Sequence, residues 1–303
     1  MTTVWVAKPE IAEALADLPE AKVSRYDGVG ALPDSLDDVE FYVPPLLSNR
    51  ASLEIMGRMP RLRVVQLQTA GVDHVRPFLP AGVTMCNARG AHDAGTAEWI
   101  VGAAIASRRE FPEFALAQRE GRWAYHQTET LTDARVLIVG YGSIGASLER
   151  RLQPFEVEIV RVARRPRAGV HAIDELPELL PDADVVVLLV PSTPETKGMV
   201  DAKFLARMKD GALLVNAARG PVVETSALLA EAAAGRLRAA VDVTDPEPLP
   251  PDHPLWRAPG VFITPHVGGS TPASTRRIAV LVREQFLRYV RGEPLRNVIT
   301  GSY

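Results

Sequence analysis

From about residue 135 onward, short runs of β-branched and aliphatic residues alternate with stretches of helical spacing or helix-favouring composition. Runs that are apolar almost throughout are typical of strands buried on both faces of a parallel sheet. They lie at residues 135–139, 157–162, 184–190, 212–216, 237–243 and 261–264. The helices predicted between them are Ser143–Leu152, Ile173–Leu180, Asp201–Met208 and Glu224–Ala234. This part of the chain therefore predicts a doubly wound α/β domain with six parallel strands.

The first 90 residues repeat this alternation more weakly. The predicted strands are residues 3–7, 22–26, 39–43, 62–67 and 83–86, and the predicted helices are Ile11–Asp17 and Ser48–Met59. Two longer helices, Gly95–Phe111 and Pro272–Val290, would each lead from one domain to the other. We therefore expect a smaller flavodoxin-like α/β domain of residues 1–94 and 272–303, a larger domain of residues 95–271, and a site in the cleft between them.

Composition and charge exclude several classes of protein. With 47% hydrophobic and 23% charged residues, the chain of 303 residues is neither disordered nor fibrous. Its formal net charge of −3 gives no electrostatic reason to expect a nucleic acid or an anionic membrane as a partner. The N-terminus lacks the pattern of a signal peptide, and no window approaches the ~18 apolar residues of a membrane span. We expect a protein that is neither exported nor inserted.

The chain has a single cysteine, Cys86, which we expect to be a small buried strand residue. One cysteine cannot form an intrachain disulfide, and no Cys and His residues have the spacing of metal ligands. Both features are typical of a metal-free protein of the reducing cytoplasm.

The strongest local signal is the segment Gly140–Gly145, a Gly-x-Gly-x-x-Gly pattern between an apolar strand and a helix. Gly140 permits a tight turn, Gly142 lets the backbone approach a pyrophosphate, and Gly145 allows close packing of the helix. Ser143 and Ile144 open that helix, whose first N–H groups and dipole favour an anion. The segment predicts a Rossmann-type domain that binds a dinucleotide.

The residues after the next strand bear on which dinucleotide is bound. An NAD-binding domain places an acid about 20 residues after the glycines, where it binds the ribose 2′-hydroxyl. Here Arg164, Arg165 and Arg167 follow the strand, and the nearest acid, Glu158, lies inside it. Guanidinium groups suit a 2′-phosphate. The pattern favours NADP(H), and NAD(H) is the alternative if these arginines form only a solvated loop.

Polar residues that suit acid–base chemistry follow three further strands. Asn216 and Arg219 come at the end of one strand, Asp242 and Glu247 at the end of the next, and His266 after the last. Ligands of open α/β sheets bind at these carboxyl ends. An arginine there can hold a carboxylate and polarise a carbonyl. A histidine paired with a carboxylate keeps one tautomer and can donate a proton near neutral pH.

These motifs closely resemble, in order and spacing, those of the D-isomer-specific 2-hydroxyacid dehydrogenases. The match rests on the glycine pattern, Asn216-x-x-Arg219-Gly220, Asp242-x-x-x-x-Glu247-Pro-Leu-Pro and Thr-Pro-His266-x-Gly-Gly. Residues 68–73 look like the substrate-carboxylate loop of the family, and residues 86–99 look like the segment that enters its interdomain helix. The formate-dehydrogenase branch is disfavoured because Glu247 keeps an acid beside the histidine.

The resemblance implies a role for each matching residue. Arg219 would bind and polarise a 2-oxo acid, His266 would be the acid/base, and Glu247 would orient His266. Backbone N–H groups of Ala70 and Gly71 would hold the substrate carboxylate. The residues that would contact the cofactor are Gly140, Gly142, Ser143, Ile144, Gly145, Arg164, Arg165, Val190, Pro191, Thr196, Ala217, Asp242 and Gly268. Among them, Asp242 would receive the nicotinamide carboxamide. Thr244 departs from the family, which more often has a bulky residue there.

The chain is thus identified as a member of this family and predicted to be an NADPH-preferring reductase of a small 2-oxo acid such as glyoxylate or hydroxypyruvate. A phosphoglycerate-type or bulkier branched 2-oxo acid remains an alternative substrate. A rival of another class is a dinucleotide-sensing protein like the transcriptional corepressors that share this fold. The resemblance also implies a homodimer, with helix 95–111 and the loop through Trp123, Tyr125 and His126 at the interface. The aromatic residues of that loop could equally belong to the core of their own domain.

Overall fold

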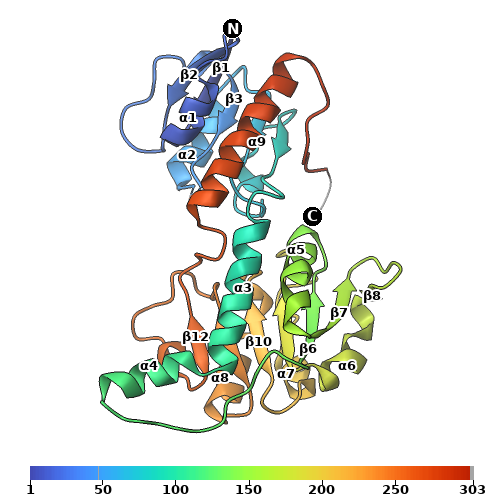
Figure 1. The fold of residues 1–303 in the computed structure, drawn as a ribbon. Helices are drawn as coiled ribbons and strands as arrows, with labels where there is room; N and C mark the ends of the chain where they lie inside the picture. Colours follow the sequence, from blue (N-terminus) through green and yellow to red (C-terminus); the bar gives the residue numbers. More distant parts are fainter. Residues whose placement is uncertain (47, 301–303) are drawn as a thin grey trace. The chain divides into compact units, whose positions relative to one another are not determined.

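The chain divides into two compact units, each built on one parallel sheet (Figure 1). The computed structural model describes residues 1–46 and 48–300. Unit 1 comprises Met1–His92 and the segment from Ser270 onward, and unit 2 is Asp93–Gly269. The sequence-based boundaries, at residues 94 and 271, lie slightly later along the chain.

The sheet of unit 1 has the strand order β2-β1-β3-β4-β5. Its strands are β1 (Thr2–Val6), β2 (Ala21–Arg25), β3 (Val39–Val43), β4 (Val64–Gln66) and β5 (Thr84–Cys86). The helices are α1 (Pro9–Leu15), α2 (Arg50–Glu54) and α9 (Pro272–Val290). This is the strand order of flavodoxin-like folds, as predicted. The helix predicted over residues 48–59 is shorter, because α2 continues into a 3₁₀ turn at Ile55–Arg58.

Both faces of β1, β3 and β4 are covered, which explains why these strands are largely apolar on both sides. In β1, Val4 and Val6 face one hydrophobic cluster, whereas Trp5 faces the other. Helix α9 lies beside α1 on the first of these faces (Figure 1). Its Phe286 packs edge-on against Phe41 of β3, with ring centroids 5.8 Å apart. The C-terminal helix therefore belongs to unit 1.

The sheet of unit 2 has the order β12-β11-β10-β9-β6-β7-β8, and all pairings are parallel. Its strands are β6 (Arg135–Val139), β7 (Glu158–Ala163), β8 (His171–Ala172), β9 (Val185–Leu188), β10 (Leu213–Asn216), β11 (Arg238–Val241) and β12 (Val261–Ile263). The helices are α3 (Asp93–Arg108), α4 (Phe111–Arg119), α5 (Ser143–Leu152), α6 (Leu176–Leu179), α7 (Ala202–Arg207) and α8 (Thr225–Ala233). The doubly wound fold is as predicted. The expectation of six strands was wrong because the sheet has a seventh strand, β8, at its edge. This strand has only two residues, too few to form an apolar run in the sequence.

Two predicted helices of unit 2 also differ in the structure. The helix predicted over Gly95–Phe111 ends at Arg108, and α4 follows it after a break at Glu110, whose φ is +53°. Pro112 lacks the N–H that a continuous helix needs but fits the first turn of α4. The helix predicted over residues 173–180 is the single turn α6 between two 3₁₀ turns, and prolines lie in α6 (Pro177) and in the second 3₁₀ turn (Pro181).

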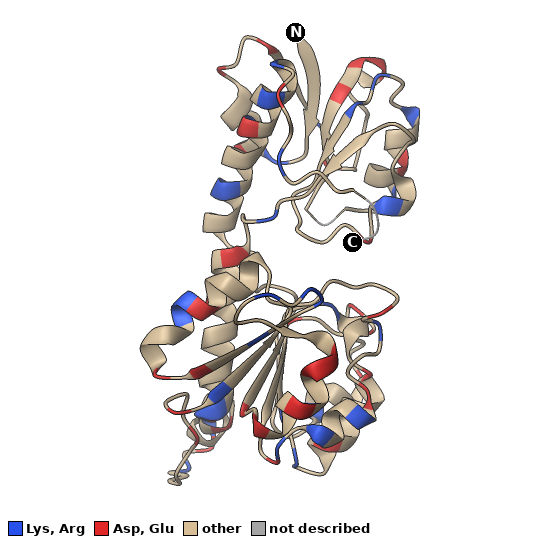
Figure 2. Cartoon of the chain, turned by 90° about the vertical axis from the view of Figure 1, so that its right-hand side faces the viewer, with Lys and Arg blue, Asp and Glu red and all other residues tan. Residues whose placement is uncertain are grey.

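The strands of unit 2 send alternate side chains into two separate cores. In β6, Val136 and Ile138 join the cluster under α3 and α5, and Leu137 and Val139 join the cluster on the other face. Because both faces are buried, the strands have no polar alternation. The charged residues instead lie mainly on the helices and loops around the strands (Figure 2). None of the helices in the described part of the chain is long and apolar enough to cross a membrane.

Cys86 in β5 is completely buried, as the sequence predicted. Burial raises the pKa of its thiol to about 11 because the interior disfavours the thiolate. We therefore expect Cys86 to react negligibly with Ellman's reagent at pH 8 in the folded protein and rapidly in guanidinium chloride, because the thiolate is the reactive form. Time-resolved absorbance measures both rates, and rapid labelling of the folded protein would contradict the buried position.

Candidate active site

The predicted catalytic residues follow neighbouring strands in unit 2. Asn216 ends β10, Asp242 directly follows β11, and His266 follows β12. These strands are adjacent and parallel, so their carboxyl ends form one edge of the sheet. Three segments that are distant in the sequence therefore place polar side chains at the edge where open α/β sheets bind ligands.

His266 and Glu247 form a direct hydrogen bond. The imidazole Nδ1 lies 2.6 Å from Glu247 Oε1, and the two side chains are 44% and 42% exposed. His266 has a φ of +54°, in the left-handed region, and its backbone N–H donates to the carbonyl of Asp242 over 2.7 Å. A non-glycine residue in this region is strained, and such strain is often found at functional sites. With Nδ1 bonded to the carboxylate, Nε2 is the ring nitrogen that can exchange a proton with a ligand.

The carboxylate of Asp242 organises the loop that carries His266. It is buried and accepts hydrogen bonds from Thr264 Oγ1 at 2.5 Å and from the backbone N–H groups of Val267 and Gly268, both at 2.8 Å. A Cβ on Gly268 would lie 2.9 Å from Asp242 Oδ2, so this close approach requires glycine. The sequence indicated Asp242 and Gly268 as cofactor residues but gave no role to Thr264. In the structure, the contacts among Asp242, Thr264 and Gly268 fix the loop that carries His266.

Arg219 lies in a turn shaped by Asn216. The Asn216 side chain accepts from Ala218 N at 3.0 Å and donates to the carbonyl of Arg219 at 3.2 Å. The Arg219 side chain is half-buried, and its Nη1 donates to the carbonyl of Ala218 over 2.7 Å. Asn216 therefore holds the backbone from which the guanidinium projects.

The glycine after Arg219 is required by the neighbouring strand connection. A Cβ on Gly220 would lie 1.9 Å from the carbonyl oxygen of Thr244, which no real contact allows. Thr244, the departure noted in the sequence, is buried and donates from Oγ1 to the carbonyl of Pro246 over 2.8 Å. Thr244 therefore connects the turn at Arg219 and Gly220, which lies against its carbonyl, to the segment that carries Glu247.

The glycine-rich loop fits a pyrophosphate group. Gly140 has a φ of +107°, and a Cβ there would lie 2.6 Å from the backbone of Leu189. A Cβ on Gly142 would meet nothing within 4 Å, so the space over the start of α5 is open. Gly142 precedes that helix and has no side chain to cap its first N–H groups, which Ser143 and Ile144 help to supply.

In the described part of the chain, no group of three or more His, Cys, Asp or Glu residues could hold a metal ion.

Arg164 and Arg165 follow β7 and are exposed. A hydrogen bond from Thr193 lowers the pKa of Glu195, and the charge of Arg164 contributes to this shift, so Arg164 lies near Glu195 in the loop after β9. Glu158 is the first residue of β7 and so lies at the amino end of the strand, away from Arg164 and Arg165. There its Oε1 lies 3.4 Å from Arg135 Nε. The carboxyl end of β7 thus presents arginines, as the sequence indicated.

Other residues predicted to contact the cofactor also follow strand ends. Val190 and Pro191 come just after β9, and Ala217 comes just after the adjacent β10. Thr196 closes the loop after β9 by donating from Oγ1 to the carbonyl of Pro191 over 2.6 Å and accepting from Thr193 N at 2.8 Å. Thr196 therefore shapes this loop.

Ala70 and Gly71 lie together in a turn of unit 1 after β4. The carbonyl of Ala70 accepts from Asn87 Nδ2 at 2.7 Å, and the carbonyl of Gly71 accepts from Thr69 Oγ1 at 2.7 Å. Asn87 is buried and was not singled out in the sequence, because nothing near it in the chain indicates which carbonyl it meets. The turn is held in shape by side chains on both sides of it.

Residues 101–268 match the model of the NAD-binding domain of the D-isomer-specific 2-hydroxyacid dehydrogenases. A glyoxylate reductase of Thermofilum pendens is 32% identical, and the match covers 82% of this chain and 78% of that protein. A D-3-phosphoglycerate dehydrogenase of Archaeoglobus fulgidus is 29% identical over 82% of this chain, which is 49% of its own length. The structure of an NADPH-dependent glyoxylate/hydroxypyruvate reductase of Sinorhizobium meliloti, in complex with NADP and sulfate, is 27% identical with a TM-score of 0.86, covering 99% of this chain and 98% of that one.

Proposed function

Because the chain belongs to the D-isomer-specific 2-hydroxyacid dehydrogenases, an oxidoreductase family, we propose that it is an NADPH-preferring reductase of a small 2-oxo acid such as glyoxylate or hydroxypyruvate. The observation that carries the proposal is the hydrogen bond between His266 and Glu247 at the carboxyl edge of the sheet. A glyoxylate reductase and a glyoxylate/hydroxypyruvate reductase among the similar proteins support the choice of substrate.

The catalytic residues would each act on one part of the substrate. A bound nicotinamide cofactor supplies the hydride that is added to C2. His266 donates the proton from Nε2 to the carbonyl oxygen, so that hydride and proton together convert the C2 carbonyl to a hydroxyl group. Glu247 stabilises the imidazolium through Nδ1 before that transfer. Arg219 stabilises the negative charge that develops on the oxygen, and backbone N–H groups of Ala70 and Gly71 hold the carboxylate.

The cofactor would be held by the residues that follow β6, β7, β9, β10 and β11. The N–H groups at the start of α5 would bind the pyrophosphate, for which the open space at Gly142 leaves room. Arg164 and Arg165 would bind a 2′-phosphate, and Val190, Pro191 and Thr196 would flank the adenosine. The Asp242 carboxylate accepts three hydrogen bonds from its own loop, from Thr264, Val267 and Gly268. A carboxylate has about four lone-pair sites, so it could accept a further hydrogen bond from the nicotinamide carboxamide.

A spectrophotometric screen of NADPH oxidation tests the proposed reaction. The panel contains glyoxylate, hydroxypyruvate, phosphohydroxypyruvate and a branched 2-oxo acid, and we expect the small acids to give the highest kcat/KM. A preference for phosphohydroxypyruvate would assign the substrate of the Archaeoglobus fulgidus relative instead. Binding of NADPH without turnover of any acid would favour a dinucleotide sensor over an enzyme.

Arg164→Asp is expected to reverse the cofactor preference. A charge-assisted hydrogen bond to a 2′-phosphate contributes about 1.5 to 3 kcal/mol, equivalent to roughly a 10- to 100-fold preference for NADPH in the wild-type protein. Solvent exposure of Arg164 favours the lower end of this range. The aspartate repels the phosphate and can accept from a 2′-hydroxyl, so NADH becomes the better cofactor.

Steady-state kcat/KM for NADPH and NADH at fixed ionic strength measures this preference. Arg165→Asp is the matched variant, and a smaller effect there would show that its side chain points away from the ribose. Equal kcat/KM values for the two cofactors in the wild-type protein would show that these arginines are only a solvated loop.

The assembly we propose is a homodimer in the cytoplasm, in which α3 and the loop after α4 form the interface. Trp123 and Tyr125 in that loop are 94% and 88% exposed, which excludes the alternative that they belong to the core of their own unit. His126 is anchored by a hydrogen bond of 2.8 Å to Glu110. Large exposed aromatic side chains of this kind are typical of protein interfaces.

A further inference from the structure

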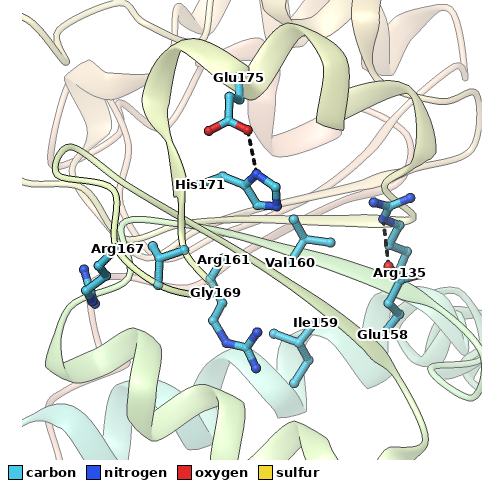
Figure 3. A pocket seen from close by; sticks show the side chains of 10 residues that line it. Arg135, Glu158, Ile159, Val160, Arg161, Arg167, Gly169, His171 and Glu175 are labelled. Carbon is cyan, nitrogen blue, oxygen red and sulfur yellow. Dashed lines mark hydrogen bonds and ion pairs between the residues drawn. The ribbon is translucent and has the colours of Figure 1, made fainter.

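The pocket in Figure 3, of about 450 Å³, lies over β7 and β8 and is lined by several cationic side chains. Two of the basic side chains are paired with carboxylates that also line the pocket: Arg135 with Glu158, and His171 with Glu175. These pairs leave little charge for a ligand. Arg161 and Arg167, however, point away from the His171–Glu175 pair (Figure 3), and both reach Tyr141 in the glycine-rich loop.

The ring of Tyr141 has both guanidinium groups within cation–π range. The Cζ atoms of Arg161 and Arg167 lie 5.8 Å and 5.4 Å from the ring centroid. The Tyr141 hydroxyl donates to Glu149 on α5, and the same carboxylate accepts from Arg161 Nε at 2.8 Å. The hydrogen bond from Arg161 lowers the pKa of Glu149, so the carboxylate stays ionised. A Cβ on Gly145 would lie 3.1 Å from the ring, so Tyr141 also covers the first turn of the helix.

Arg167 in addition holds the loop backbone. Its Nη2 donates to the carbonyl of Tyr141 over 2.8 Å, and the N–H groups of Gly140 and Tyr141 both donate to the carbonyl of Val162 over 2.9 Å. In a trans peptide the carbonyl and the following N–H point in opposite directions, so fixing the carbonyl of Tyr141 also fixes the N–H of Gly142. The glycine-rich loop is thus held from the strand on one side and from Arg167 on the other.

We propose that Arg167 is a positioning residue for dinucleotide binding. By holding the carbonyl and the ring of Tyr141, it keeps the glycine-rich loop in the shape that receives the pyrophosphate. A loop held in its bound shape loses less conformational entropy on binding. The pyrophosphate is common to both cofactors, so Arg167 strengthens NADPH and NADH binding alike, whereas Arg164 and Arg165 act on the 2′-phosphate alone. This inference rests on the dinucleotide-binding part of the proposed function.

Arg167→Ala is expected to weaken NADPH and NADH binding by the same factor, about 10-fold, because the lost hydrogen bond has a charged but exposed donor. Kd values from fluorescence titration of the purified protein measure both affinities, and kcat at saturating cofactor should stay near the wild-type value. Arg167→Lys should recover part of the affinity, because an ammonium can still donate to the carbonyl. Tyr141→Phe, which keeps the ring, should weaken both cofactors less.

Arg150→Ala is the matched control. Arg150 is an exposed arginine of α5, and its Nη1 donates to the carbonyl of Ala146 in the same helix. If Arg167→Ala weakens NADPH alone, Arg167 is a 2′-phosphate ligand and the inference is wrong. The inference also fails if neither affinity changes. If Arg167→Ala does not fold, the lysine and phenylalanine variants decide between the same outcomes. Absence of dinucleotide binding by the wild-type protein would instead overturn the proposed function, and this inference with it.

Discussion

Replacing His266 with alanine is expected to lower kcat for 2-oxo acid reduction about 10²- to 10⁴-fold, the usual contribution of a positioned general acid. The affinity for NADPH should change little, because the pyrophosphate and the 2′-phosphate would be bound by other segments. Stopped-flow turnover gives kcat, and fluorescence titration gives the Kd for NADPH. A variant that keeps more than about a tenth of the wild-type kcat would contradict the assignment of His266 as the acid.

The protein contains a matched control for this experiment. His171 and Glu175 form a second pair with the same separation of 2.6 Å and similar exposure, but they lie at β8, on the far edge of the sheet from β12. His171→Ala should therefore leave kcat unchanged, which separates the effect of position from that of losing any histidine–carboxylate pair.

Glu247→Gln should lower kcat less than His266→Ala does, because the amide still orients the ring but no longer stabilises the imidazolium.

Arg219→Lys should lower kcat/KM about 10²- to 10³-fold although the charge is kept, which is the range for loss of one donor to a developing oxyanion. Lysine offers a point charge on a flexible stem and cannot reproduce two parallel N–H bonds. Asn216 bonds the backbone around residue 219 and not its side chain, so the turn itself should persist in the variant.

Steady-state kinetics with the best 2-oxo acid measure this loss, and NADPH titration confirms that the cofactor site is intact. Arg207→Lys, in the last turn of α7, is the control for an arginine-to-lysine change elsewhere in unit 2. Near-normal kcat and KM in the Arg219→Lys variant would show that Arg219 does not anchor the substrate.

The strands were predictable because a buried parallel strand must be apolar on both faces. The sequence runs at residues 135–139 and 212–216 coincide with or contain β6 and β10 for this reason. Strand β8 was missed because two residues at a sheet edge need no apolar run. The break at Glu110 was also missed, although Pro112 in the first turn of α4 marks it locally. The structure adds that Arg238 of β11 and His126 both bond the Glu110 carboxylate, which the sequence did not indicate.

The site was predictable only as far as local signals reach. The glycine spacing located the turn after β6, and strand ends located Arg219, Asp242 and His266. No local signal pointed to Thr264 as a partner of Asp242, or to Asn87 as a partner of Ala70. The sequence indicated no role of its own for Arg167 among the arginines after β7, whereas the structure shows that Arg167 donates to the carbonyl of Tyr141.

By itself, the sequence indicated the position of every described strand except β8, and the chemical groups near the carboxyl ends of the strands, because burial and turn geometry depend on neighbouring residues. Only the tertiary structure decided which of these groups meet. Glu247 reaches His266 because β11 and β12 pair in parallel and bring their following loops together. Gly220 must be glycine because the carbonyl of Thr244 lies against it. Such contacts depend on the register of adjacent strands and the path of the loops, which no short stretch of sequence contains.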